Sequence, residues 1–288
     1  MTPVRRRMAG LAVALSALAA AGCAVSPPEP SIRPTASYDS VGVVYSDADG
    51  EQLDADLCLP EDPRPAGAVV LVHGGAFESG DRTSMAGACD LVASWGLVGM
   101  AVDYRLLPEH PYPAQVEDVQ AAVEWLRSPA QQEQYGIDPA QVALWGSSAG
   151  SIIALSAAEN LAGDGQPVAG VVGLSAAGDL TEGGLALGTP APELQAAVLA
   201  YLGCPSVEDC PVAAEASPST DAASLPPILL VHSERDAIPL AQAEALAAAT
   251  QDAGGDAELL VVPGSHHGLQ LLSSDVRATI ERFLDDVI

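Results

Sequence analysis

The fold of this chain is decided by the stretch Val142-Ala143-Leu144-Trp145-Gly146-Ser147-Ser148-Ala149-Gly150, which Ile152-Ile153-Ala154-Leu155 follows. A strand-like apolar run leads into the pentapeptide G-x-S-x-G, and a helix-like run comes after it. At a strand-to-helix turn this pentapeptide is typical of a nucleophilic serine, although the letters alone are weak. Because the turn is sharp, we expect a strained Ser148 flanked by residues without a Cβ. The alternative is a glycine–serine turn without a chemical role.

Three other strand-like runs lead into residues that suit the same chemistry. They are Val69–Val72 before Gly74 and Gly75, Ile228–Val231 before Asp236, and Glu258–Val262 before His267. A glycine pair after a strand lets backbone N–H groups point at an oxyanion. The carboxyl ends of parallel strands meet at one edge of a sheet, so we expect these loops to converge with Ser148. The chain order serine, aspartate, histidine differs from those of chymotrypsin and subtilisin.

Together these motifs resemble the α/β-hydrolase superfamily, close to the hormone-sensitive-lipase-like and feruloyl/acetyl-xylan-esterase-like carboxylesterases. The matching stretches are His73-Gly74-Gly75-Ala76-Phe77 with Ser79-Gly80-Asp81, Asp103 to Pro111, Pro113-Ala114-Gln115 with Glu117-Asp118, Tyr135 to Pro139, Trp145 to Gly150, Pro226 to His232 with Asp236, and His267-Gly268. The resemblance runs from Val41 to the C-terminus. Two residues depart from it: Ala76 replaces the third glycine of the family's HGGG, and Ser151 a glycine after the turn.

The resemblance implies a role for each catalytic residue. Ser148 is the nucleophile, His267 the general base, and Asp236 the carboxylate that fixes the imidazole tautomer. The oxyanion hole is formed by the backbone N–H groups of Gly74, Gly75 and Ala149. The family places its base immediately before a glycine, which favours His267 over the neighbouring His266. This chemistry needs no cofactor.

Strand-like and helix-like segments alternate along the chain, which predicts a mostly parallel sheet with helices on both faces. One helix is expected over Pro113–Ser128, and another at the C-terminus with Val276, Ile280 and Phe283 on one face. The stretch Thr181–Ser224 lies between the sixth and seventh strands, where this superfamily inserts a lid, and here the insertion is short.

The N-terminus has the pattern of an export signal. Arg5-Arg6-Arg7 precedes an uncharged run from Met8 to Ala21, which is short for a membrane span. Cys23 after Ala-Gly resembles a bacterial lipobox, and ordinary cleavage nearby is the alternative. We therefore expect a lipoprotein-type signal peptide over residues 1–22, a proline-rich tether over 23–40 and one catalytic domain over 41–288. The protein would be tethered to the outer face of the cell membrane by its lipid, or else secreted.

The charge and the cysteines fit an exported protein. The formal net charge is −27, which argues against nucleic acid and against docking on anionic lipid. Apart from Cys23 there are four cysteines, and an even number in an oxidising compartment favours disulfides. Cys204 with Cys210 would close a short loop and leave Cys58 to pair with Cys89; free thiols are the alternative. No spacing indicates a metal site.

The sequence thus predicts a serine carboxylesterase acting on short acyl esters, either small molecules or esters linked to carbohydrate. A peptidase or a lactonase on the same fold is the alternative within enzymes, because the fold does not determine the leaving group. A non-catalytic surface-binding protein on a hydrolase fold is the alternative outside them. The natural substrate, the acyl-chain preference and the oligomeric state do not follow from the sequence.

Overall fold

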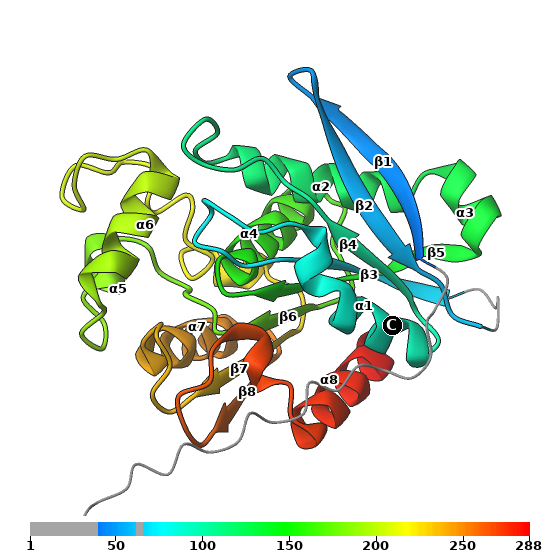
Figure 1. Ribbon diagram of the computed structural model, residues 1–288. Coiled ribbons are helices and arrows are strands. Elements are labelled where there is room, and N and C mark those ends of the chain that lie inside the picture. Colours follow the sequence, from blue (N-terminus) through cyan, green and yellow to red (C-terminus); the bar gives the residue numbers. More distant parts are fainter. Residues whose placement is uncertain (1–39, 62–65) are drawn as a thin grey trace, which may run out of the picture. The chain divides into compact units, whose positions relative to one another are not determined.

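The computed structural model describes residues 40–61 and 66–288, and its centre is an eight-stranded sheet (Figure 1). The strands are β1 (Ser40–Ala48), β2 (Glu51–Cys58), β3 (Ala66–Val72), β4 (Val98–Val102), β5 (Ile137–Ser147), β6 (Val171–Leu174), β7 (Ile228–Ser233) and β8 (Ala257–Val262). Their order across the sheet is β1-β2-β4-β3-β5-β6-β7-β8. The strand β2 is antiparallel to both β1 and β4, and all other neighbours are parallel. The predicted fold class is therefore confirmed.

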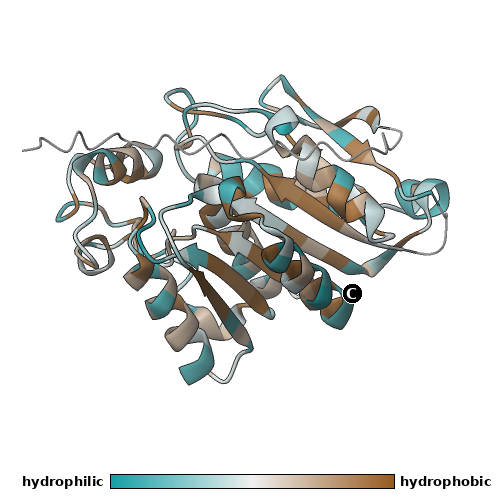
Figure 2. Cartoon of the chain, turned by 60° about the horizontal axis from the view of Figure 1, so that its bottom comes forward, coloured by the Kyte–Doolittle hydropathy of each residue, from teal (hydrophilic) through white to brown (hydrophobic). Residues whose placement is uncertain are grey.

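Helices cover both faces of the sheet. They are α1 (Ala86–Ser94), α2 (Ala114–Leu126), α3 (Pro129–Tyr135), α4 (Ala149–Gly163), α5 (Glu182–Leu185), α6 (Pro192–Leu202), α7 (Leu240–Asp252) and α8 (Ser274–Val287), with short 3₁₀ turns at Arg82–Met85, Ala222–Ser224 and Gly268–Leu271. Apolar residues of α2, α4 and α7 form one core with one face of the sheet, and those of α1 and α8 form a second core with the other. Figure 2 shows the hydrophobic strands between these layers. No described helix has the length and apolar character that a membrane crossing needs.

The sequence pattern explains the two layers. Every residue of β4, β6 and β7 is buried, as expected for strands covered on both faces. Pro113 precedes α2, which lies within the predicted 113–128 range and buries the apolar residues expected of it. In α8 the residues Val276, Ile280 and Phe283 are buried on one face, also as expected.

The topology places the candidate site. The chain passes from β3 to β4 on one side, and β5 then lies on the other side of β3. This reversal is a topological switch point, and loops at the carboxyl ends of the two strands diverge there to leave a crevice. The loop after β3 begins at His73 and the turn after β5 holds Ser148. The two motifs therefore meet at the part of an α/β sheet where ligands bind.

The insertion between β6 and β7 contains α5, α6 and the turn Ala222–Ser224. It is fastened to α7 by Gln242, whose side chain is only 3% exposed. The amide oxygen of Gln242 accepts from the N–H groups of Gly178 and Asp179, and its amide nitrogen donates to the carbonyls of Asp179 and Gly184, all at 2.8–3.1 Å. One buried amide thus satisfies four backbone groups at the start of the insertion.

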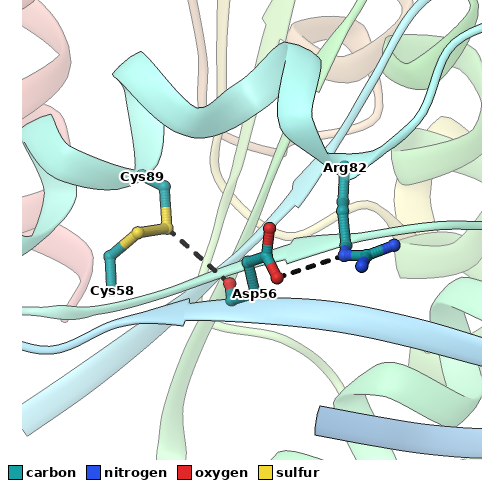
Figure 3. Close-up of a disulfide and its surroundings, with 4 residues drawn as sticks. All are labelled: Asp56, Cys58, Arg82 and Cys89. Carbon is teal, nitrogen blue, oxygen red and sulfur yellow. Dashed lines mark hydrogen bonds and ion pairs between the residues drawn. A yellow bond between two sulfur atoms is a disulfide. The ribbon is translucent and has the colours of Figure 1, made fainter. Parts of the chain in front are cut away.

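Two disulfides connect elements of the domain. Cys204 is bonded to Cys210 just after α6, and Cys58 at the end of β2 to Cys89 of α1, which is the pairing expected from the sequence. Figure 3 shows Cys58–Cys89 beside Asp56, whose carboxylate accepts from Arg82 at 3.1 Å. The 3.8 Å approach of the Cys89 sulfur to the Asp56 carbonyl is a contact, because a disulfide sulfur has no proton to donate. Cys23 and the predicted signal and tether regions lie outside the described residues.

Candidate active site

Ser148 occupies the sharp turn between β5 and α4. Its φ of 56° and ψ of −122° are rare for a residue with a side chain, and its backbone N–H donates to Leu174 O at 2.8 Å. A Cβ at Gly146 would overlap the carbonyl oxygen of Gly150, and one at Gly150 would overlap the carbonyl of Val72. The turn therefore requires both glycines for steric reasons. It leaves Ser148 partly exposed at the start of a helix, where the dipole favours negative charge.

His267 and Asp236 complete a line of hydrogen bonds to this serine. The Nε2 atom of His267 lies 2.8 Å from the Oγ atom of Ser148, and its Nδ1 atom lies 2.6 Å from Oδ1 of Asp236. The carboxylate of Asp236 is fully buried, whereas the imidazole is 34% exposed. The loops after β5, β7 and β8 thus bring together the three residues that the sequence singled out.

The environment of Asp236 keeps its carboxylate ionised. Burial raises its pKa, but hydrogen bonds from His267 and Ser175, the nearby His232 and the N–H of Ile238 together bring that pKa below its usual value. An ionised Asp236 can only accept hydrogen bonds. The proton of the His267 imidazole therefore lies on Nδ1, which leaves the lone pair of Nε2 facing the hydroxyl of Ser148.

The loop after β3 brings backbone N–H groups close to Ser148. A Cβ at Gly74 would lie 3.0 Å from that of Ser148, so the two chain segments are in contact. Gly75, Ala76 and Phe77 all have positive φ, and the N–H of Ser79 donates to Gly75 O at 3.1 Å, which closes the turn. Within residues 40–61 and 66–288, no acceptor pairs with the N–H of Gly74, Gly75 or Ala149. An oxyanion hole formed by these three groups stays a prediction.

Aromatic rings support this loop from behind. The His73 ring stacks on Tyr104 with 4.2 Å between ring centroids, and the Tyr104 hydroxyl donates to His73 O at 2.9 Å. The Nδ1 atom of His73 donates to Gly74 O at 2.7 Å, and burial lowers the pKa of the ring. On the other side Phe77 stacks on Tyr201 of α6 at 3.9 Å. His73 therefore holds the backbone of the loop, and the insertion packs directly against it.

The remaining histidines lie away from the nucleophile. His266 is exposed, and its backbone carbonyl accepts from the Ser233 hydroxyl at 2.7 Å. His232 is fully buried, and its Nε2 atom donates to Ile238 O at 2.7 Å. His110 pairs with Glu51 at 3.3 Å. Among the five histidines only His267 is placed against Ser148.

A cavity of about 600 Å³ lies beside the loop after β3. Its walls are Glu78, Leu107 with Pro108, and Ala200 of α6. Glu78 belongs to the turn closed on Gly75, and the N–H of Leu107 donates to Phe77 O at 3.0 Å, so the cavity borders the loop after β3. In the described part of the chain no group of three or more His, Cys, Asp or Glu side chains could hold a metal ion.

Sequence reasoning missed one residue of this site. Ser175 follows β6 directly, and its hydroxyl donates to Asp236 Oδ2 at 2.6 Å. The signal was available, since β6 ends at the same edge of the sheet as β5, β7 and β8. That position is the only signal in the sequence, because serine is common in turns and the local pattern does not distinguish Ser175.

Comparisons with known proteins agree with the fold. Residues 69–271 match a protein family described by its alpha/beta hydrolase fold. Esterase LipI of Mycobacterium tuberculosis is 40% identical over 108 residues, which are 37% of this chain and 33% of that protein. Esterase LipC of the same bacterium is 30% identical over 252 residues, or 80% and 60% of the two chains. The chain therefore covers less than two thirds of the length of these relatives.

A solved structure extends the similarity over most of the chain. A bacterial heroin esterase superposes with a TM-score of 0.73 and 28% identity, covering 85% of this chain and 84% of the other. The superposition therefore covers most of each chain.

Proposed function

We propose that this chain, which belongs to the α/β-hydrolase fold family, is a carboxylesterase that hydrolyses short acyl esters with Ser148, His267 and Asp236. The observation that carries the proposal is the line of hydrogen bonds from Ser148 Oγ through His267 to Asp236, at 2.8 and 2.6 Å. Gly74, Gly75 and Ala149, whose N–H groups have no acceptor among the described residues, lie in the loop beside this serine and directly after it. The relatives and the matched structure are also named as esterases.

The geometry supports the following steps of an acyl transfer. Ser148 Oγ attacks the ester carbonyl while His267 Nε2 takes the hydroxyl proton, and the N–H groups of Gly74, Gly75 and Ala149 bind the resulting oxyanion. When the tetrahedral intermediate collapses, the C–O bond to the alcohol breaks and His267 returns the proton to the departing oxygen. Water then attacks the acyl-enzyme, again with His267 as base, and releases the acid and free Ser148.

The insertion favours small substrates. Only α5, α6 and a 3₁₀ turn lie between β6 and β7, and α6 packs against the oxyanion loop through Tyr201. The adjoining cavity of about 600 Å³ has room for a short acyl chain or a small alcohol. We therefore propose acetyl to butyryl esters, of small molecules or of carbohydrate, as the substrate class.

We also propose that the protein is exported and held at the outer face of the cell membrane by a lipid on Cys23. Arg5-Arg6-Arg7, the apolar run and Ala-Gly before the cysteine support this. Fractionation of cells that express the full chain tests it: Cys23→Ser should move the protein out of the membrane fraction or block its processing. If the wild-type chain itself stays unprocessed in the membrane fraction, the result would instead indicate a retained signal anchor.

The activity is tested with protein that lacks residues 1–22. We expect it to hydrolyse p-nitrophenyl acetate and butyrate much faster than palmitate, and Ser148→Ala to abolish the reaction. Equal rates for the two proteins would refute the proposal and favour a non-catalytic binding role. Peptide amides and lactones in the same panel decide the alternatives, since faster Ser148-dependent turnover of either would identify a peptidase or a lactonase.

A further inference from the structure

Ser175 lies where the acid and the base of the site meet. It is the first residue after β6, it is fully buried, and its φ of 54° is unusual for a residue other than glycine. Its backbone N–H donates to Val231 O at 2.9 Å, which attaches it to β7. Its hydroxyl donates to Asp236 Oδ2 at 2.6 Å and accepts from the N–H of Gly268 at 2.8 Å. Gly268 is the residue after His267.

We propose that Ser175 is a positioning residue for the reaction: its single hydroxyl keeps Asp236 ionised and oriented, and fixes the loop that carries His267. The inference rests on the proposed function, because it assigns a role within the same site. Ser175 does not touch the substrate or the nucleophile. It acts through Asp236 and His267, and His267 in turn contacts the hydroxyl of Ser148.

The polarity of the hydrogen bonds carries the argument. The N–H of Gly268 can only donate, so the Ser175 oxygen accepts there and its own proton is directed at Asp236 Oδ2. That oxygen must then be an acceptor, and a proton bound to it would clash with the Ser175 proton. Ser175 therefore disfavours protonation of Asp236. An ionised Asp236 in turn keeps the His267 proton on Nδ1 and the lone pair on Nε2.

Nothing else in the site replaces this hydroxyl. Oδ1 of Asp236 accepts from His267 Nδ1 at 2.6 Å and from the N–H of Ile238 at 3.1 Å. Oδ2 has Ser175 as its one hydrogen-bond donor among the described residues, because His232 Nε2 is 3.9 Å away and already donates to Ile238 O. Without Ser175 a fully buried carboxylate oxygen loses its partner, and the carboxylate gains freedom to rotate about its last bond.

The test compares Ser175→Ala and Ser175→Gly with wild type on p-nitrophenyl butyrate. Both variants remove the hydroxyl, but only glycine relieves the strain of the positive φ. A loss of kcat that both variants share is therefore caused by removal of the hydroxyl. Removing a hydrogen bond to a charged group should lower kcat about 10- to 100-fold, with KM changed by less than about threefold. The acid limb of the kcat/KM profile should move to higher pH, because Asp236 becomes easier to protonate.

Ser217→Ala is the matched control. Ser217 is also fully buried, its hydroxyl donates to Ala213 O and accepts from the N–H of Leu180, and it contacts neither Asp236 nor His267. This variant should lose stability comparably and keep the wild-type acid limb. The proposal is overturned if both Ser175 variants keep kcat within about threefold of wild type. It is also overturned if kcat falls while the acid limb of the kcat/KM profile stays in place, because a merely structural change would have that effect.

A measurement without turnover separates this proposal from the proposed function. Proton NMR can follow the titration of the His267 imidazole, assigned by its loss in His267→Gln, in protein with Ser148→Ala. Adding Ser175→Ala should move the titration midpoint, because the partner carboxylate is perturbed. An unmoved midpoint would count against Ser175 whatever the activity. Absence of esterase activity in wild type would refute the proposed function. The titration of His267 would still decide whether Ser175 acts on the acid and the base, because it needs no turnover.

Discussion

The two adjacent histidines after β8 allow a sharp test of the site. His267 lies 2.8 Å from Ser148 Oγ through its Nε2 atom, whereas the His266 ring is exposed. Replacing His267 by alanine removes the only base that contacts the nucleophile among the described residues, and it leaves the N–H groups of the predicted oxyanion hole in place. In such a triad the loss of the histidine costs about 10⁶ in kcat, which corresponds to about 8 kcal/mol of barrier.

His266→Ala is the matched control in the same loop. The hydrogen bond from Ser233 goes to the backbone carbonyl of His266, which alanine retains. Removing an exposed ring changes the free energy of unfolding by no more than about 0.5 kcal/mol, so the variant should fold like wild type. Because this ring does not contact Ser148, kcat should stay within about twofold of the wild-type value.

The assay is steady-state hydrolysis of p-nitrophenyl butyrate, with circular dichroism melts to confirm folding of both variants. A residual rate for His267→Ala should remain above that of the uncatalysed reaction, because substrate binding and the oxyanion hole persist. The reverse pattern, with His266→Ala inactive and His267→Ala active, would refute the assignment of the base. Similar losses in both variants would indicate that the conformation of the loop, rather than one imidazole, was measured.

Four further outcomes are expected. Gln242→Leu should lower the unfolding free energy by about 2–4 kcal/mol in denaturant melts, since buried backbone groups lose their partners; a change below about 0.5 kcal/mol would contradict this. Burial raises the pKa of Glu159 to about 8, so this group favours the folded state below the pKa of an unfolded glutamate and loses that contribution as pH rises toward 8. The Tm advantage of Glu159→Gln over wild type should therefore grow from pH 5 to pH 8, and a constant difference would refute it. Glu78→Gln should raise kcat/KM for p-nitrophenyl hemisuccinate about fivefold, the effect of about 1 kcal/mol of repulsion, and leave the butyrate value within about twofold; equal changes for both esters would rule out a charge effect. Mass spectrometry of unreduced exported protein should link Cys204 to Cys210, and free thiols at both would exclude the bond.

The sequence predicted the parts of the fold and site that depend on local pattern. The turn at Ser148 could be recognised because its steric requirement specifies glycine at both flanking positions, so the constraint is written in the residues themselves. The same holds for the loop at Gly74 and Gly75, and for strands buried on both faces, which need continuous apolar runs. Element boundaries were less certain: β5 runs over Ile137–Ser147, longer than the four apolar residues that indicated it.

The features that escaped prediction depend on contacts between distant segments. Ser175 is 61 residues from Asp236 and 93 from Gly268, and no periodicity links a serine after β6 to an acid after β7. Gln242 likewise meets Gly178 and its neighbours across 64 residues. Polar residues of this kind act through hydrogen-bond direction, which a one-dimensional pattern does not encode.

This difference bears on how the site works. Ser148, His267 and Asp236 have the residue types that the chemistry requires, but their protonation states are not a property of residue type. In this structure the direction of the hydrogen bonds contributes to these states, and it begins at the backbone N–H of Gly268, which can only donate. Through Ser175 that direction is passed to Asp236, from Asp236 to His267, and from His267 to the hydroxyl of Ser148. Because each group in the line can take only one role once its neighbour is fixed, the serine faces a proton acceptor before any substrate arrives.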